Sequence, residues 1–170
     1  DLDVLEVDPA RAKIGIAATG TTFDAVRQAL LDLGVDDAAL HRAGIRLLRI
    51  GMPYPVGQQS VREFARGLEQ VIVVEDKTAF IETQVREILY GTTGAPQIIG
   101  KHDAAGAPLF PLGGELTAAR LLAPLRRVLR DHVELKRTPP PPLSLEVLSA
   151  KRTAYFCSGC PHNRSTAIPE

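Results

Sequence analysis

Several features that would place a chain in a special class are scarce in this sequence. It has two cysteines in 170 residues, too few for a disulfide framework. Its 20 basic residues balance its 20 acidic residues, without a long block of either sign. No stretch approaches the roughly 18 uninterrupted apolar residues of a membrane span. We therefore expect neither nucleic acid nor a membrane among its partners, because both rely on a charged or apolar surface that is missing here.

The remaining composition is that of an ordinary globular domain. Hydrophobic residues make up 45% of the sequence and charged residues 24%, and its 170 residues suit one domain with an appendage. The chain starts at Asp1 without a methionine and stops shortly after a cysteine motif. We therefore expect a fragment of a longer polypeptide, to which part of the function belongs.

Strand and helix patterns alternate along the first 134 residues. Apolar runs at residues 12–18, 45–50, 71–74 and 97–99 predict short strands. Apolar residues between these strands recur at helical spacing and predict four helices. The first runs from a capping-box-like pair, Thr21 and Asp24, to Gly34, and the second begins at the capping box of Ser60 and Glu63. The other two cover residues 78–90 and 116–132. Pro124 lies inside the last helix, where we expect it to kink the helix or delay its start.

This alternation predicts a three-layer α/β domain over residues 1–134. Strands that are joined by crossover helices form a parallel sheet with helices on both faces. Residues 2–7 alternate between apolar and polar side chains, as in a half-exposed edge strand, for which an antiparallel direction is allowed. Beyond this domain, four consecutive prolines within residues 135–150 favour an extended, semi-rigid linker. Residues 151–170 carry both cysteines and show no periodicity.

Three segments of the α/β domain follow predicted strands, where ligands bind in such folds. Residues 15–22 occupy a phosphate-binding position, but they lack the P-loop lysine and the dinucleotide glycine pattern, and a tight turn is the commoner explanation. Residues 51–55 form a loop with two prolines. Glu75 and Asp76 could make a carboxylate site, although carboxylates at this position more often stabilise the start of the next helix.

Imidazole and basic side chains give no site by their spacing. His41, His102 and His132 are scattered without a second ligand at metal spacing, so we expect surface histidines. The last helix and the linker carry a group of basic residues: Arg126, Arg127, Arg130, Lys136 and Arg137. Cationic side chains near a helix C-terminus suit its dipole, so we favour a solvated face over a phosphate-binding patch.

Cys157 and Cys160 form a C-x-x-C pair, typical of ligand or redox chemistry in a reducing compartment, and we expect a cytoplasmic protein. Pro161 separates Cys160 from His162, which excludes a c-type haem motif. A thioredoxin-type pair should open a helix within a βαβ unit, whereas this pair lies beyond the proline-rich segment, near the end of the chain. A zinc site would need two further ligands, and only His162 is near. An iron–sulfur cluster takes four cysteines, so this pair would supply half of a site.

The residues around the cysteines are more specific than the pair itself. The segment YFCSGCPHNRST at residues 155–166 resembles the beginning of the thiamine-diphosphate domain of indolepyruvate ferredoxin oxidoreductases, particularly their long, fused form. Residues 44–55, 73–77 and 96–101 are similar to the same enzymes. The similar segments extend from about Ile14 to Thr166, which is nearly the whole chain.

The resemblance implies the identity of each part of the chain. Residues 1–134 would be a transketolase C-terminal-like domain, a three-layer α/β unit with a five-stranded, mostly parallel sheet and one antiparallel edge strand. Residues 135–150 would be a proline-rich linker, and residues 151–170 the truncated start of the thiamine-diphosphate-binding domain. The family's parent enzymes oxidatively decarboxylate aryl 2-oxo acids to acyl-CoA with thiamine diphosphate, Mg, a 4Fe–4S cluster and CoA as cosubstrate, and they reduce ferredoxin.

The resemblance also implies where the chemistry takes place. In the wider superfamily the cofactor lies between the thiamine-binding domains, so no catalytic or cofactor-binding residue is assigned to residues 1–134. In related enzymes a C-x-x-C at the start of the thiamine domain ligates a cluster, and by position Cys157 and Cys160 would be half of that site, which we expect to be empty in this chain alone. Pro161 stands where many relatives have glycine. The implied partners are the remaining domains of the parent chain, ferredoxin, and further copies in a homo-oligomer.

Three hypotheses follow from the sequence. The first is a non-catalytic middle domain of such an oxidoreductase, inactive on its own. The second is a freestanding α/β module that binds a small ligand at residues 15–22 or 51–55. The third is a small thiol redox protein that uses Cys157 and Cys160.

Overall fold

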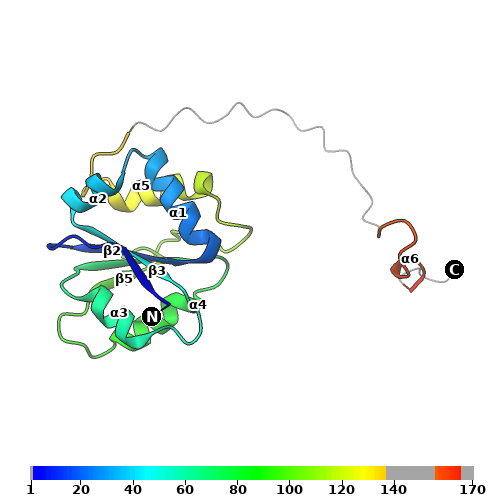
Figure 1. The fold of residues 1–170 in the computed structure, drawn as a ribbon, viewed down its shortest axis with the longest axis horizontal. Coiled ribbons are helices and arrows are strands. Elements are labelled where there is room, and N and C mark those ends of the chain that lie inside the picture. The colour runs from blue at the N-terminus through cyan, green and yellow to red at the C-terminus, as the bar shows by residue number, and fades with distance from the viewer. Residues whose placement is uncertain (1, 137–155, 166–170) are drawn as a thin grey trace. The chain divides into compact units, whose positions relative to one another are not determined.

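The computed structural model describes residues 2–136 and 156–165 (Figure 1). The chain divides into two compact units, residues 1–138 and residues 139–170, and each is described by itself. The predicted linker at residues 135–150 lies outside the described residues except for its first two positions. Within the described ranges, no helix combines the length and the apolar character that a membrane crossing requires.

The first unit consists of strands and helices that alternate along the chain. In chain order its described elements are β1 (Val4–Val7), β2 (Ile14–Thr19), α1 (Gly20–Asp32), α2 (Asp37–Ala43), β3 (Ile45–Ile50), α3 (Gln58–Ala65), β4 (Gln70–Val74), α4 (Phe80–Leu89), β5 (Gln97–Ile99) and α5 (Ala118–Leu129).

The strands form one five-stranded sheet with the order β1-β3-β2-β4-β5. The pairs β2–β3, β2–β4 and β4–β5 are parallel, whereas β1 pairs antiparallel with β3 at one edge of the sheet. Helices α1, α2 and α5 cover one face and α3 and α4 cover the other (Figure 1). The predicted fold class, a three-layer α/β domain with a mostly parallel sheet and one antiparallel edge strand, is therefore confirmed.

The core is divided between the two faces of the sheet by the alternation of side chains along each strand. On β2, Ile16 and Ala18 pack with α1, α2 and α5, whereas Ala17 packs with α3 and α4. On β4, Ile72 belongs to the first layer and Val73 to the second. Both strands are buried on both faces, which is why they appear in the sequence as unbroken apolar runs.

The helix starts differ from the predicted capping boxes. Gly20 has a φ of 51°, a conformation that favours glycine, and it turns the chain into α1 before Thr21 is reached. Helix α3 begins at Gln58 with Gly57 at the N-cap, so Ser60 lies inside the helix. Neither N-cap residue makes a side-chain hydrogen bond to its helix. Both capping-box predictions are therefore wrong.

The end of α1 is as predicted. Gly34 has a φ of 82°, and its N–H donates to the carbonyl oxygen of Leu31 at 2.8 Å. The N–H of Val35 donates to Leu30 at 2.8 Å, which completes a Schellman motif. Helix α2, which was not predicted, follows at once.

Helix α2 has seven residues and begins where the Asp36 carboxylate accepts a hydrogen bond from the N–H of Ala39 at 2.8 Å. A helix of this length is too short to show a full apolar stripe. At the C-terminal end of the unit, α5 runs through Pro124, so the proline does not delay its start. Burial of Leu121, Leu125 and Leu129 on one face of α5 favours the continuous helix.

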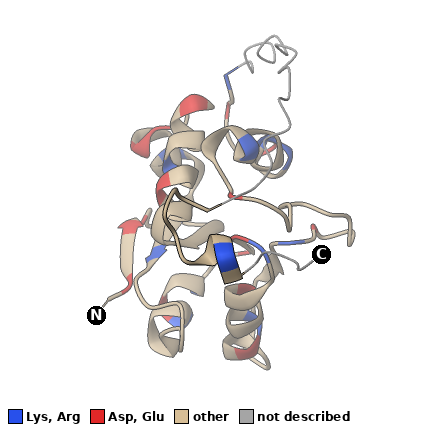
Figure 2. Cartoon of the chain, turned by 90° about the vertical axis from the view of Figure 1, so that its right-hand side faces the viewer, with Lys and Arg blue, Asp and Glu red and all other residues tan. Residues whose placement is uncertain are grey.

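Acidic and basic residues are intermixed on the helices and loops of the α/β unit (Figure 2). In the second unit, residues 156–165 contain a turn followed by the short helix α6 (His162–Ser165).

Candidate functional site

The carboxyl ends of the parallel strands meet at one edge of the sheet, and all three candidate segments lie there. Strand β2 pairs in parallel with β3 on one side and with β4 on the other. The turn after β2, which lies within residues 15–22, the loop after β3 at residues 51–55 and the loop after β4 at residues 75–77 are therefore neighbours.

The turn after β2 has the contacts of a tight strand-to-helix connection. The Thr19 hydroxyl donates to the carbonyl oxygen of Ile50 at 2.7 Å, which ties the end of β2 to the end of β3. Gly15 lies within β2, where an added Cβ would come within 2.5 Å of the Phe64 and Leu68 side chains. The glycines of this segment therefore permit close packing and the turn conformation.

The loop after β3 is held by side chains from two other segments. The Gly51 N–H donates to the Asp3 carboxylate at 2.9 Å. From α4, the Gln84 side chain donates to the carbonyl oxygen of Pro53 at 3.0 Å and accepts from the N–H of Val56 at 3.0 Å. The loop contains a cis Tyr54–Pro55 peptide bond.

The loop after β4 uses its carboxylates internally. Glu75 is buried, and its two carboxylate oxygens accept hydrogen bonds from the N–H groups of Phe80, Ile81 and Glu82 at 2.7–3.0 Å. Asp76 accepts from the N–H of Leu116 at 2.8 Å. The interpretation that these carboxylates stabilise the start of the next helix is thus confirmed for Glu75, because it binds the first N–H groups of α4.

A charged network, buried at Glu82 and Lys101 and exposed at Arg86, continues from Glu75 toward β5. The Lys101 ammonium donates to the backbone carbonyl oxygen of Glu75 at 2.5 Å, and the Lys101 N–H donates to the Glu82 carboxylate at 2.9 Å. The other oxygen of Glu82 accepts from Arg86 at 2.7 Å, and Arg86 also donates to the carbonyl oxygen of Ile98 at 2.7 Å. The network fixes the ends of β4 and β5 against α4.

The electrostatics of this network centre on Lys101, which is 4% exposed. Burial lowers the pKa of Lys101 because it disfavours the charged ammonium, and the nearby carboxylates of Glu75, Asp76 and Glu82 oppose that effect. No role for Glu82 or Lys101 was predicted from the sequence. The available signal was the i,i+4 spacing of Glu82 and Arg86 on a predicted helix.

The second unit brings the two cysteines into one turn. The N–H of Cys160 donates to the carbonyl oxygen of Cys157 at 3.0 Å, and the Asn163 side chain donates to the same carbonyl oxygen at 3.0 Å. The Cys160 Sγ lies 3.2 Å from the His162 Nδ1. Both thiols are free, and Cys157 is exposed.

The donor set of this turn fits part of a metal site. Two thiols on one C-x-x-C turn match two of the four cysteine ligands of an iron–sulfur cluster. Across the described ranges 2–136 and 156–165, no group of three or more His, Cys, Asp or Glu side chains is arranged to hold a metal ion. Within those ranges, the pair therefore lacks the further ligands that a cluster needs.

The scattered histidines behave as surface residues, whereas the basic group includes the half-buried Arg126, whose Nε atom is buried. His41, His102 and His132 are exposed. Arg127 pairs with Asp103 at 3.1 Å. The Arg126 guanidinium donates to the carbonyl oxygen of Lys136 and so fastens the end of the unit, while Arg137 lies outside the described residues.

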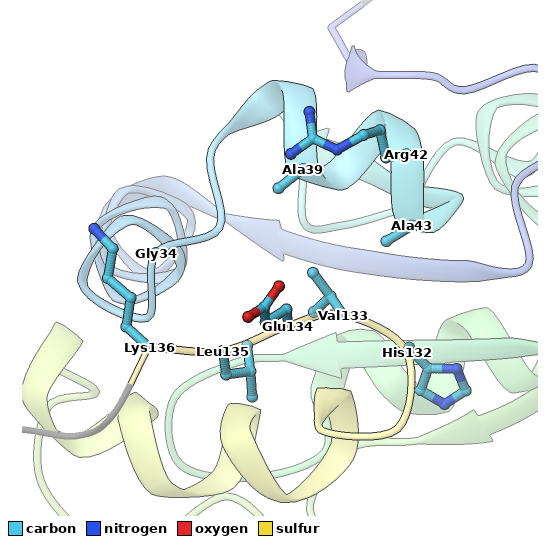
Figure 3. Close-up of a pocket in the computed structure, with 9 residues that line it drawn as sticks. All are labelled: Gly34, Ala39, Arg42, Ala43, His132, Val133, Glu134, Leu135 and Lys136. Atoms are coloured by element: carbon cyan, nitrogen blue, oxygen red, sulfur yellow. The ribbon is translucent and has the colours of Figure 1, made fainter.

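A groove of about 460 Å³ lies away from the carboxyl edge, between α2 and the segment that follows α5 (Figure 3). The lining of the groove combines apolar side chains with charged and polar ones. Its lining residues are Gly34, Ala39, Arg42, Ala43, His132, Val133, Glu134, Leu135 and Lys136. No sequence pattern indicates this groove, because its lining residues come from distant parts of the chain.

The α/β unit matches a known protein family. The family model described as "Indolepyruvate oxidoreductase domain" matches residues 6–138. The chain belongs to this family. The resemblance to indolepyruvate oxidoreductases found in the sequence is thereby confirmed.

Curated relatives match over nearly the whole chain. The indolepyruvate oxidoreductase subunit IorA of Pyrococcus horikoshii is 26% identical over 159 residues, 92% of this chain and 22% of that protein. The IorA subunit of Thermococcus kodakarensis is 28% identical over 156 residues, 91% of this chain and 22% of that protein. The chain thus spans about a fifth of the length of these relatives.

Similar solved structures include a split gene transketolase in an inactive beta4 tetramer, with a TM-score of 0.49 and 18% identity over 76% of this chain and 43% of that chain. A 2-oxoglutarate:ferredoxin oxidoreductase from Magnetococcus marinus gives a TM-score of 0.44 and 18% identity over 74% of this chain and 19% of that chain.

Proposed function

We propose that this chain is a non-catalytic middle domain of a thiamine-diphosphate-dependent indolepyruvate-type ferredoxin oxidoreductase. The parent enzyme oxidatively decarboxylates aryl 2-oxo acids to acyl-CoA in the cytoplasm and passes the electrons to ferredoxin. In this proposal residues 1–134 are the transketolase C-terminal-like domain, residues 135–150 the linker, and residues 151–170 the start of the thiamine-diphosphate-binding domain.

The observation that carries the proposal is the family match over residues 6–138 of a chain that spans only 22% of its curated relatives. The geometry of the carboxyl edge supports a structural role. Glu75 and Glu82 are buried and accept hydrogen bonds from backbone and arginine donors, so their carboxylate oxygens have partners inside the domain. A general acid or base instead needs a carboxyl group that can reach the substrate.

We further propose that Cys157 and Cys160 provide two thiolate ligands of a 4Fe–4S cluster in the parent, whose other ligands come from outside this chain. When bound, the parent's thiamine diphosphate would stabilise the carbanion, Mg would hold its diphosphate group, the cluster would accept electrons one at a time, and CoA would accept the acyl group. The exposed position of Cys157 and the turn that joins it to Cys160 leave the pair accessible to such a cluster.

An activity assay tests the main proposal. The chain alone and the full-length enzyme are incubated with indolepyruvate, thiamine diphosphate, Mg, CoA and an electron acceptor. We expect acceptor reduction with the full-length enzyme and none with the chain alone. Turnover by the chain alone would refute its assignment as a non-catalytic domain, and a full-length enzyme without 2-oxo acid activity would refute the parent function.

Iron analysis of the full-length enzyme tests the cysteine assignment. Cys157→Ser and Cys160→Ser should each lower the iron and sulfide content and the cluster absorbance, because each removes a thiolate ligand. Ser158→Ala, between the two cysteines, is the matched control and should retain full content. If both serine variants keep the cluster, Cys157 and Cys160 are not its ligands.

A freestanding ligand-binding module is the second candidate, and the groove in Figure 3 favours it because its volume of about 460 Å³ suits a small molecule. Thermal-shift measurements with nucleotides, CoA and thiamine diphosphate separate the two candidates. A ligand present at 100 times its dissociation constant should stabilise the fold by about 2.7 kcal/mol. An Arg42→Ala variant that abolished such a shift would place the ligand in this groove.

A further inference from the structure

We propose that Met52, Tyr54 and Phe80 form a docking surface for a neighbouring domain of the same oxidoreductase polypeptide. These three residues are called the aromatic patch below. The inference rests on the proposed function, because the neighbouring domain is another part of the longer parent chain.

The aromatic patch is exposed, and two of its three side chains lie side by side. The rings of Tyr54 and Phe80 lie 5.8 Å apart, although Tyr54 comes from the loop after β3 and Phe80 is the first residue of α4. Met52 is 40% exposed, Tyr54 69% and Phe80 50%. Single exposed apolar residues are common on proteins, whereas the largest apolar patch on a monomer, typically about 300–600 Å², is often functional.

Hydrogen bonds hold the patch in place before any partner binds. On the Tyr54 side, Gln84 binds the backbone of Pro53 and Val56. On the Phe80 side, the buried Glu75 carboxylate accepts the N–H of Phe80 at 3.0 Å. A partner would therefore meet a preorganised backbone, and docking would cost little ordering entropy.

A groove beside the patch offers a complementary recess. It has a volume of about 360 Å³ and lies between α3 and α4. Its lining combines apolar and charged side chains: Tyr54, Pro55, Val56, Gln58, Arg62, Gln84, Glu87 and Ile88. The patch and the groove together match a partner surface with an apolar centre and a polar rim.

The area of the patch decides which kind of partner it fits. Given the 150–250 Å² that a buried aromatic side chain contributes, the three side chains expose roughly 300 Å². Two separate proteins need about 800 Å² on each side for a stable interface, so these three side chains supply less than half of the area that a second copy from solution would need. Domains of one chain meet at high effective concentration and dock through smaller contacts.

The relatives indicate that such a neighbour exists. Because this chain spans 22% of the IorA subunits, most of each of those polypeptides lies outside the matched part. The small area of the patch and the greater length of the relatives therefore both favour a neighbouring domain of the parent polypeptide as the occupant.

Hydroxyl-radical footprinting with mass spectrometry tests the proposal directly, because methionine, tyrosine and phenylalanine side chains all react when exposed. The chain alone and the full-length enzyme are oxidised under the same dose. Tyr90, which is 91% exposed and lies at the opposite end of α4 from Phe80, is the internal control.

We expect Met52, Tyr54 and Phe80 to react several-fold more slowly in the full-length enzyme than in the chain alone, with Tyr90 unchanged. Equal rates at the patch in both proteins would overturn the proposal. Protection that appears in the chain alone as its concentration rises would also overturn it, because a second copy would then be the occupant.

A double variant, Tyr54→Ser with Phe80→Ser, provides a second measurement. In the chain alone its melting temperature should stay close to that of the wild type, because both rings are exposed. In the full-length enzyme it should restore fast oxidation at Met52, whereas Tyr90→Ser should not. Footprinting and turnover test the two proposals separately. An active enzyme with an unprotected patch refutes the docking surface. A protected patch in an enzyme without 2-oxo acid activity refutes the proposed function.

Discussion

The Lys101 ammonium donates to the backbone carbonyl oxygen of Glu75 at 2.5 Å, so a buried cation joins the end of β5 to the end of β4. The contact lies among the carboxylates of Glu75, Asp76 and Glu82. These four residues determine the geometry of the carboxyl edge of the sheet, and the first predictions concern them.

Lys101→Met should destabilise the fold by about 3 kcal/mol, since removal of one member of a buried charged group leaves the others uncompensated. The measurement is urea unfolding at pH 7. Lys13→Met is the matched control, because Lys13 makes an exposed ion pair with Glu69, and its cost should stay below about 0.5 kcal/mol. Equal costs for the two variants would contradict a stabilising role of the Lys101 network.

The cost of Lys101→Met should grow as the pH rises toward 10. Burial lowers the pKa of Lys101 in the folded protein, whereas the unfolded chain keeps a value of about 10.4. Between these two values the unfolded state binds more protons, so the stability of the wild type rises with pH through this group, and the variant lacks that gain. Urea unfolding of both proteins at each pH unit from 7 to 10 measures the difference in unfolding free energy between the wild type and the variant. If this difference becomes smaller as the pH rises, the pKa of Lys101 is not lowered in the folded protein.

Glu75→Ala should destabilise the protein by about 2–4 kcal/mol, because three N–H groups at the start of α4 lose their acceptor. Glu75→Gln keeps one carbonyl oxygen as an acceptor and should cost less. Glu87→Ala, at an exposed position of the same helix, should be nearly neutral. The loss of unfolding free energy should be largest for Glu75→Ala, smaller for Glu75→Gln and smallest for Glu87→Ala. Any other order would argue against this capping role.

Gly15→Ala should cost about 1–3 kcal/mol through overpacking, because the new Cβ would collide with Phe64 and Leu68. Gly113→Ala is the control, since no heavy atom lies within 4 Å of a Cβ at that position. Thermal unfolding of both variants gives the comparison. A neutral Gly15→Ala would mean that α3 shifts to accept the methyl group.

The fold was predictable where the pattern of one segment was sufficient. The run of β-branched residues in β4 and the position of Gly34 after α1 were both found from local sequence. Helix α2 was missed, because seven residues carry too little periodicity. The two capping boxes were predicted wrongly, since the glycines before Thr21 and Ser60 start both helices earlier.

Local sequence patterns were sufficient for the alternation of strands and helices and for the family resemblance, because both depend on residues that are close together in the chain. The capping of α4 by Glu75, the contact of Lys101 with Glu75 and the meeting of Tyr54 with Phe80 are visible only in three dimensions. Each of these contacts depends on how loops from different strands come together at one edge of the sheet. Sheet order and register place those loops, and no local pattern of residues encodes them.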